Sequence, residues 1–119
     1  MNLIEGKIGE ADGRRVFVSG SGTLLPLPDK YRALLPGRDV TYGIRPEHLV
    51  VSPGPTAFAA AIDLVKPMGS ETQVVLSLGN YKIVGMFRER IAGKTGDMIF
   101  LDLPVEKISV FDSGTGKRI

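Results

Sequence analysis

Cysteine is absent from the 119 residues, and histidine occurs only once, at position 48. The first absence excludes disulfides and thiolate metal sites. The second leaves His48 without the second histidine, nucleophile or clustered carboxylates that metal binding or base catalysis would require. We therefore interpret His48 as non-catalytic and predict that the chain is not an enzyme and holds no cofactor of its own.

Long apolar runs are also missing, since none approaches the roughly 20 residues of a membrane-spanning helix. The N-terminus has neither the basic start nor the apolar core of a signal peptide. Together with the missing cysteines, these features predict a cytoplasmic location. Basic and acidic residues are nearly balanced, 15 against 13, which disfavours a surface that binds nucleic acid.

Glycine and proline, by contrast, are plentiful. Fifteen glycines and eight prolines are spread along the chain, and such punctuation is typical of short strands joined by tight turns. Alternating apolar residues predict nine strands, over residues 2–9, 14–19, 23–25, 39–45, 58–64, 72–78, 81–85, 98–103 and 108–111. The single predicted helix covers residues 29–35, with Asp29 as its N-cap and Pro36-Gly37 ending it.

These elements predict an all-β chain of about eight or nine short strands with one short helix. Short strands with glycine at the corners favour a closed or nearly closed barrel, because closure removes exposed edges. The length predicts a single domain over residues 1–119. A possible internal seam lies near 52–56, where prolines and a glycine cluster.

The segment Arg45-Pro46-Glu47-His48 directly follows the predicted strand 39–45. Because proline fixes its own φ and holds the preceding residue extended, the strand is expected to end at Arg45, with Glu47 and His48 projecting beside it. One interpretation is a charged cluster that makes a specific contact across an interface. The other is a local pair of Arg45 and Glu47 that fastens the corner and contributes about 0–1 kcal/mol.

The segment Met68-Gly69-Ser70-Glu71-Thr72 links two predicted strands. Gly69 can adopt a positive φ, and Ser70 and Thr72 offer hydroxyls and backbone donors to a small anion. The alternative is an ordinary β-turn whose glycine relieves backbone strain.

Two other features have simple explanations. Gly93-Lys94-Thr95 lacks the earlier glycine and the following helix of a phosphate loop, so the chain is not expected to bind ATP. Arg88-Glu89-Arg90 and Lys117-Arg118, with eight aromatic residues, are compatible with a stacking platform for nucleic acid. Because most of these rings fall on apolar strand faces, an aromatic core with a solvated charged rim is the preferred interpretation.

Several motifs occur in a fixed order: MNLIEG at 1–6, GIRPEH at 43–48, GSET at 69–72, Gly96-Asp97 before an apolar strand, and FDSGTG at 111–116. This order resembles the C-terminal regulatory domain, called TOBE, of ABC importer ATPases of the sugar and glycerol-phosphate class. The match covers most of the chain and is densest from Tyr42 onward. Met68 departs mildly from the leucine that is usual in the family.

The resemblance implies a barrel similar to the oligonucleotide-binding (OB) fold that acts without catalysis. In the family two copies pack together and hold the ATPase dimer, membrane permease subunits are partners, and some relatives receive inhibitory regulatory proteins. ATP and magnesium would bind only to an ATPase domain, which has no counterpart in this sequence. The sequence is therefore expected to be an excised domain or a shortened product, located at the cytoplasmic face of the inner membrane.

The residues expected to form the regulatory interface, or the corner that supports it, are Arg45, Glu47, His48, Gly69, Ser70 and Glu71. Two other functions stay open at this level. A small module binding oxyanions such as molybdate or sulfate would need a cluster of lysine, serine and backbone donors, which the sequence does not reveal. An oligonucleotide-binding domain would need exposed aromatic rings and steep salt dependence.

Overall fold

A computed structural model describes residues 1–56 and 58–119, which are built almost entirely from antiparallel strands. The strands are β1 Asn2–Ala11, β2 Arg14–Ser19, β3 Leu24–Pro26, β4 Asp39–Ile44, β5 Val50–Val51, β6 Ala59–Pro67, β7 Thr72–Leu78, β8 Tyr81–Phe87, β9 Met98–Asp102 and β10 Ser109–Asp112. Three single-turn 3-10 helices connect some of them, namely η1 Asp29–Tyr31, η2 Pro46–His48 and η3 Val105–Lys107.

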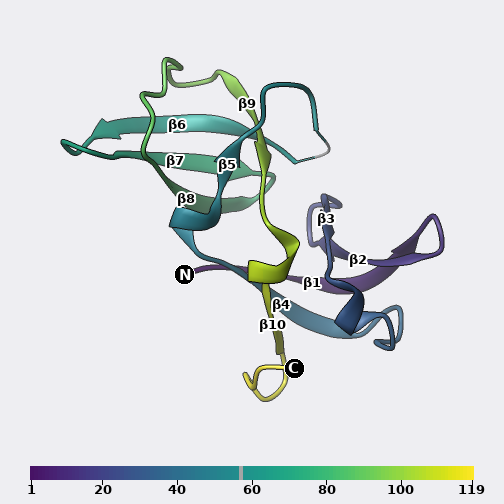
Figure 1. The fold of residues 1–119 in the computed structure, drawn as a ribbon. Coiled ribbons are helices and arrows are strands. Elements are labelled where there is room, and N and C mark those ends of the chain that lie inside the picture. The colour runs from purple at the N-terminus through teal and green to yellow at the C-terminus, as the bar shows by residue number, and fades with distance from the viewer. Residues whose placement is uncertain (57) are drawn as a thin grey trace.

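The strands form two five-stranded sheets, which lie side by side in Figure 1. Sheet A has the order β10-β4-β1-β2-β3, and sheet B has the order β5-β9-β6-β7-β8. The chain leaves sheet A after β4, passes through η2, builds sheet B, and returns through η3 to place β10 beside β4. Sheet A is therefore assembled from both ends of the chain.

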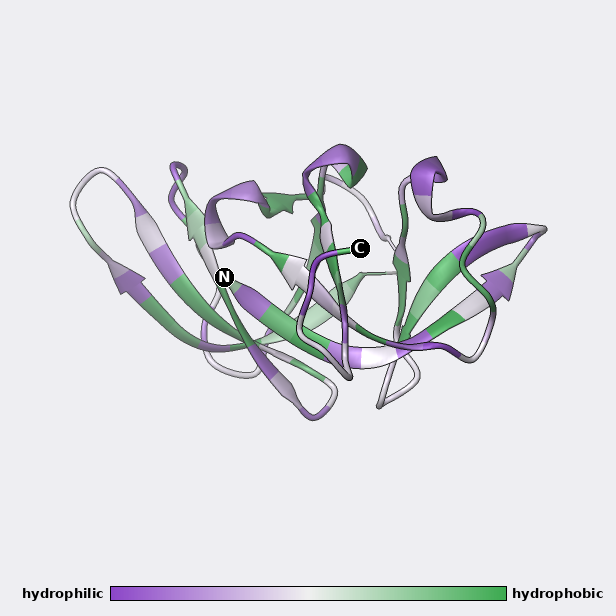
Figure 2. Cartoon of the chain, turned by 90° about the horizontal axis from the view of Figure 1, so that it is seen from below, coloured by the Kyte–Doolittle hydropathy of each residue, from purple (hydrophilic) through white to green (hydrophobic). Residues whose placement is uncertain are grey.

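Alternating residues give the strands one buried and one exposed face. Along β7 every second residue from Thr72 to Leu78 is buried, and Figure 2 shows hydrophobic and hydrophilic bands alternating along the strands. Tight turns join two pairs of these strands. Asp12 and Gly13 have positive φ values of 52° and 75°, and Gly79, with φ 60°, opens the two-residue turn from β7 to β8.

Each sheet packs an aromatic ring over a glycine. In sheet A the buried rings of Phe17 and Tyr42 stack with their centroids 4.8 Å apart. Phe17 covers Gly6, because a Cβ at that position would lie 2.6 Å from the Cζ of Phe17. In sheet B a Cβ on Gly85 would lie 2.6 Å from Cε2 of Phe87. These glycines leave the space that the large rings fill.

The two sheets meet along the edge of β8. The carboxamide of Asn2 donates from Nδ2 to the carbonyl oxygen of Val84 at 2.7 Å, and its Oδ1 accepts from the Val84 N–H at 2.9 Å. The hydroxyl of Tyr81 donates to the carbonyl of Glu5 at 3.0 Å. Strand β1 therefore runs past the outer edge of sheet B and supplies partners to backbone groups that would otherwise face solvent.

The predicted all-β class is confirmed, with two differences of detail. The described residues contain ten strands, because the two-residue β5 was not predicted. The helix predicted at 29–35 is wrong, since only Asp29–Tyr31 form a 3-10 turn; Asp29 lies inside this turn, and Pro28 occupies the N-cap position without a side-chain cap. Seven residues are too few to offset the cost of nucleating an α-helix, and the segment instead places Tyr31 in the core.

The chain crosses between the sheets at η2 and again at η3. The predicted seam near 52–56 lies later, in the connection between β5 and β6, and the division into a single domain over 1–119 stays a prediction. None of the helices in the described residues has the length and apolar character to cross a membrane.

Candidate interface site

The corner after β4 positions the first group of predicted site residues. Arg45 is extended, with φ −75° and ψ 139°, and Pro46 takes the first position of η2. The backbone N–H of His48 donates to the Arg45 carbonyl at 3.0 Å and closes the turn. The strand thus ends beside Arg45 as the proline predicts, and the side chains of Arg45 and Glu47 are exposed.

Arg45 and Glu47 do not form the local ion pair that was one interpretation of this motif. The four ion pairs of the described residues all join other side chains. His48 is half-buried, and its Nδ1 is buried without a hydrogen-bond partner among those residues. Backbone hydrogen bonding and the burial of Leu49 therefore hold the corner, and the two charges are left free for other contacts.

Glu47 and Glu71 line one surface hollow, although they lie on opposite sides of β6 in the sequence. The hollow has a volume of about 410 Å³ and is lined by Glu47, Leu49, Val50, Glu71, Met86, Phe87, Arg88 and Glu89. It exists because η2 packs against β8. The part of the chain described by the structure contains no group of three histidine or acidic side chains that could hold a metal ion.

Gly69 and Ser70 line a neighbouring hollow of about 420 Å³. Gly69 adopts φ 83°, as expected for this turn, and the N–H of Met68 donates to the carbonyl of Glu71 at 2.8 Å. The lining residues are Val65, Pro67, Gly69, Ser70, Thr72, Arg88, Glu89, Arg90 and Ile91. Arg88 and Glu89 line both hollows and form the ridge between them.

The segment Arg88-Glu89-Arg90 is the part of the site that the sequence analysis missed, because it was assigned to a solvated rim. It follows directly after Phe87, the last residue of β8, and Phe87 is paired with Thr72. The sequence did contain a signal for this part of the site. Three consecutive charged residues follow a strand whose last residue pairs with Thr72 of the GSET segment. Arg45 and His48 lie outside both hollows.

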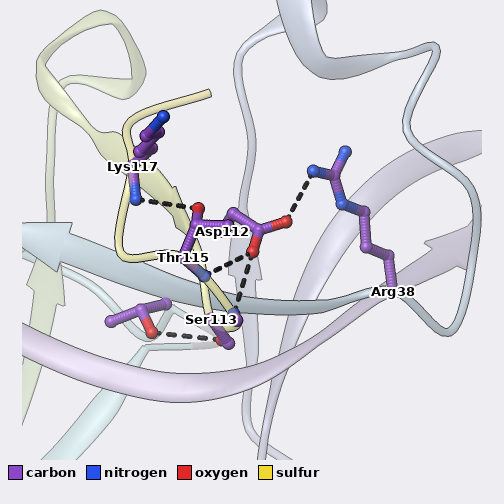
Figure 3. A network of polar contacts seen from close by, with 7 residues as sticks. Arg38, Asp112, Ser113, Thr115 and Lys117 are labelled. Carbon is purple, nitrogen blue, oxygen red and sulfur yellow. Dashed lines mark hydrogen bonds and ion pairs between the residues drawn. The ribbon is translucent and has the colours of Figure 1, made fainter.

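A separate polar network fastens the terminal motif (Figure 3). One carboxylate oxygen of Asp112 accepts from Nη2 of Arg38 at 2.9 Å, and the other accepts from the N–H groups of Gly114 and Thr115 at 2.8 and 2.9 Å. The hydrogen bond from Arg38, followed by that from Thr115, holds the pKa of Asp112 below its ordinary value. The network ties β10 to the loop before β4, so we interpret this motif as structural.

A second polar network marks a β-bulge in sheet B. The pairing of β6 with β7 shifts register between Ile62 and Leu64, which leaves Asp63 as the extra residue. The carboxylate of Asp63 accepts from Nζ of Lys82 and, at 2.7 Å, from Oγ of Ser77. The hydrogen bond from Lys82, and then that from Ser77, lowers the pKa of Asp63. The bulge is therefore held by polar contacts from the neighbouring strand β7 and from β8, the strand beyond it.

Comparison with known families gives two matches that overlap by a few residues. The MalK OB fold domain matches residues 1–49, and the TOBE domain matches residues 42–111. The matches overlap at 42–49, which includes η2 and the GIRPEH motif. Together they run through both sheets, and the site lies on the part that the TOBE match covers.

Relatives match along the full chain. It is 34% identical to an uncharacterized ABC transporter ATP-binding protein of Sinorhizobium fredii and 37% identical to an sn-glycerol-3-phosphate import ATP-binding protein of Agrobacterium fabrum, each over 100% of this chain and 31% of the relative. It is 35% identical to a trehalose/maltose import ATP-binding protein of Thermococcus litoralis, over 100% of this chain and 34% of that protein. The chain thus spans about a third of the length of these relatives.

A solved structure supports the fold independently. The cytoplasmic molybdate-binding protein ModG superposes with a TM-score of 0.70 at 14% identity, over 92% of this chain and 94% of ModG. At that identity the likeness concerns the fold alone, which is OB-like as the motif order implied. With the TOBE match covering more than half of the residues, the chain belongs to the TOBE-domain family and corresponds to the OB and TOBE portion of ABC import ATP-binding proteins.

Proposed function

We propose that this chain is a non-catalytic regulatory and dimerisation domain of an ABC import ATPase of the sugar or glycerol-phosphate class. The family matches and the names of the relatives support the class of transporter. The observation that carries the dimerisation role is the unpaired charge around the two hollows. Charged side chains of both signs line them, namely Glu47, Glu71, Arg88, Glu89 and Arg90, and the exposed Arg45 directly precedes η2.

A surface that carries unpaired charges of both signs can be self-complementary about a two-fold axis. An acidic group of one copy then faces a basic group of the other, and the arrangement repeats on the opposite side of the axis. The ion pairs of the described residues lie elsewhere, so these charges are available to a partner. Two copies joined in this way would keep their ATPase domains at a high effective concentration.

In this role the chain works at the cytoplasmic face of the membrane, beside the permease subunits of the same importer. ATP and magnesium bind to the ATPase domain, and this chain contributes the contact that persists while those domains open and close. A regulatory protein that docks on the chain would act by altering this contact.

The test is sedimentation of the chain over a wide concentration range. We expect reversible dimers, and we expect the double variant Glu47→Lys with Glu71→Lys to raise the dissociation constant about tenfold or more. Mixing it with the variant Arg45→Glu with Arg88→Glu should restore association, because opposite charges then face each other again. Glu106→Lys is the matched control, since Glu106 is exposed on η3, distant in sequence from the site.

A chain that stays monomeric at every concentration would contradict dimerisation by this domain alone. If Glu106→Lys weakened dimerisation as much as the double variant, net charge alone would explain the effect. The proposed role of the site in dimerisation would then be contradicted. Failure of the charge-swapped pair to associate, with both variants folded, would place the interface on another surface.

Two alternatives were open from the sequence, and neither is favoured over this role. Oligonucleotide binding needs exposed stacking rings, whereas Phe17, Tyr31, Tyr42, Phe58 and Phe87 are each at most 4% exposed. Binding of molybdate or sulfate would show as a thermal shift with those ions. The likeness to ModG concerns the fold and does not extend to its ligand.

A further inference from the structure

The hollow between the β6–β7 hairpin and the segment after β8 combines features of an anion-binding pocket. The inner face of sheet B supplies Val65, Pro67 and Thr72, and the turn supplies Gly69 and Ser70. The segment 88–91 turns back over this end of the sheet, where Ile91 packs against the core. Three elements separated in the sequence thus enclose one space of about 420 Å³.

Two cations in this hollow have no acidic partner among the described residues. Arg88 and Arg90 are exposed and take part in none of the four ion pairs of those residues. The two arginines are separated by a single residue in the sequence and both line the hollow. Their guanidinium groups offer several N–H donors to it, and such donors suit a phosphate or sulfate group. By contrast, Arg15 and Arg38 are each paired with a carboxylate.

Two hydroxyl groups add to the lining of this hollow. Thr72 is only 8% exposed and lines the hollow. Its hydroxyl is not a buried unsatisfied group, because His48 Nδ1 is the one such side-chain atom among the described residues. Ser70, in the turn after β6, also lines the hollow, and each hydroxyl can donate to a phosphate oxygen.

The size and the apolar lining favour an organic ligand over a bare ion. A hollow of about 420 Å³ falls within the range of small-molecule pockets. Val65, Pro67 and Ile91 offer apolar surface that an inorganic ion does not use. Glu89, the single acidic residue of the lining, would repel an anion placed against it but can accept a hydrogen bond from a ligand hydroxyl.

We propose that this hollow binds a small organic phosphate, with its phosphate group held by Arg88, Arg90, Ser70 and Thr72 and its organic part against Val65, Pro67 and Ile91. The proposal goes beyond the dimerisation role. A ligand in this position would also lie beside Arg88 and Glu89, which separate this hollow from the one lined by Glu47 and Glu71. Its phosphate group would therefore add a negative charge of about −1 to −2 near the proposed interface.

The experiment is titration calorimetry of the full chain at a concentration where it is monomeric, so that the result does not depend on dimerisation. The probes are ribose 5-phosphate, phenyl phosphate, inorganic phosphate and neutral ribose. We expect the two phosphate esters to bind more tightly than inorganic phosphate and ribose not to bind. Amide chemical-shift changes should be confined to residues 65–72 and 88–91.

Three variants locate the site. Arg88→Gln with Arg90→Gln should weaken binding of both esters about tenfold or more, and Thr72→Val should weaken it while preserving the volume of the side chain. Arg14→Gln is the control, because Arg14 is exposed in the β1–β2 hairpin, outside this hollow. Circular dichroism and thermal unfolding establish that each variant is folded.

The proposal is overturned if none of the phosphates binds to the folded wild-type chain, or if Arg14→Gln weakens binding as much as the double variant. Shift changes outside the two segments would place the ligand elsewhere. If inorganic phosphate bound as tightly as the esters, the organic part of the ligand would contribute nothing to binding. That result would overturn the assignment of an organic phosphate as the ligand.

Discussion

Asn2 takes the place of a strand partner for Val84. Its carboxamide donates to the carbonyl oxygen and accepts from the N–H of the same residue, at 2.7 and 2.9 Å, as a neighbouring strand would. One side chain at the start of β1 thereby satisfies two backbone groups on the edge strand β8 and joins the two sheets.

Replacing Asn2 by alanine should therefore destabilise the chain by about 1–3 kcal/mol, because both backbone groups of Val84 lose their partner. Urea unfolding at neutral pH measures the loss. Asn80→Ala is the control, since Asn80 lies exposed in the β7–β8 turn. Asn2→Asp, which keeps the acceptor and loses the donor, should also be destabilised, and stability equal to wild type would refute the bridging role.

Gly6 provides a second prediction, through the ring that covers it. A methyl group in Gly6→Ala would meet the Phe17 ring and the carbonyl of Val18, and neither can move far inside a packed sheet. We expect a loss of about 1–3 kcal/mol in unfolding free energy. Gly54→Ala should change stability by less than about 0.5 kcal/mol, because no heavy atom that the structure describes is found within 4 Å of the added Cβ.

The pKa values of Asp112 and Asp63 predict a specific loss of stability in acid. Both are lowered in the folded chain, by hydrogen bonds from Arg38 and Lys82 first of all. The unfolded chain therefore takes up protons at higher pH than the folded chain does, so stability rises with pH across this range. The contribution is fully present above the unfolded value of about 3.9 and is lost as pH falls through the lower folded values.

This prediction is checked by urea unfolding between pH 2 and 7. The difference in midpoint between wild type and Asp112→Asn, or between wild type and Asp63→Asn, should be largest above about pH 5 and shrink toward pH 2. Asp29→Asn serves as the comparison, since Asp29 is exposed and outside both networks. A difference that stays constant with pH would mean that the two carboxylates do not act through their charge.

Tyr42 predicts the opposite behaviour in alkali. Burial raises its pKa, and its hydroxyl donates to the carbonyl of Pro26 at 2.6 Å. Above about pH 10 the unfolded chain loses this proton while the folded chain keeps it, so stability falls as pH rises. Tyr42→Phe should cost about 0.5–1.5 kcal/mol at neutral pH and reduce the sensitivity to alkali.

Ultraviolet titration provides the spectroscopic check on Tyr42. Up to the pH at which the chain unfolds, wild type and Tyr42→Phe should give the same tyrosinate absorbance, because Tyr42 does not ionise while it is folded. Greater tyrosinate absorbance in the folded wild type would show that Tyr42 is accessible and would contradict its burial.

Local features were the part of the fold that the sequence could predict. The turns at Asp12-Gly13 and Gly79-Asn80, the positive φ of Gly69 and the end of β4 at a proline all depend on a few neighbouring residues. The helix at 29–35 failed because a short segment takes its conformation from what it packs against. There Tyr31 enters the core and the carbonyl of Leu34 accepts from Nε of Arg15.

Non-local relationships could not be predicted in the same way. Nothing in the local pattern pairs β10 with β4, or places Asn2 against Val84, because these contacts depend on how the two sheets meet. The candidate site shows the same limit. Glu47 and Glu71 were identified from motifs, whereas the position of Arg88 and Arg90 beside Ser70 follows only from the return of the chain after β8.

The placement of β10 in sheet A has a consequence for how the chain is made. A ribosome releases residues in order, so β1 to β4 emerge before sheet B, and β4 lacks its outer partner while all of sheet B is synthesised. During that interval one edge of the first sheet is open to any other strand, including that of a second nascent chain. Completion of sheet A thus depends on residues that are translated after the whole of sheet B.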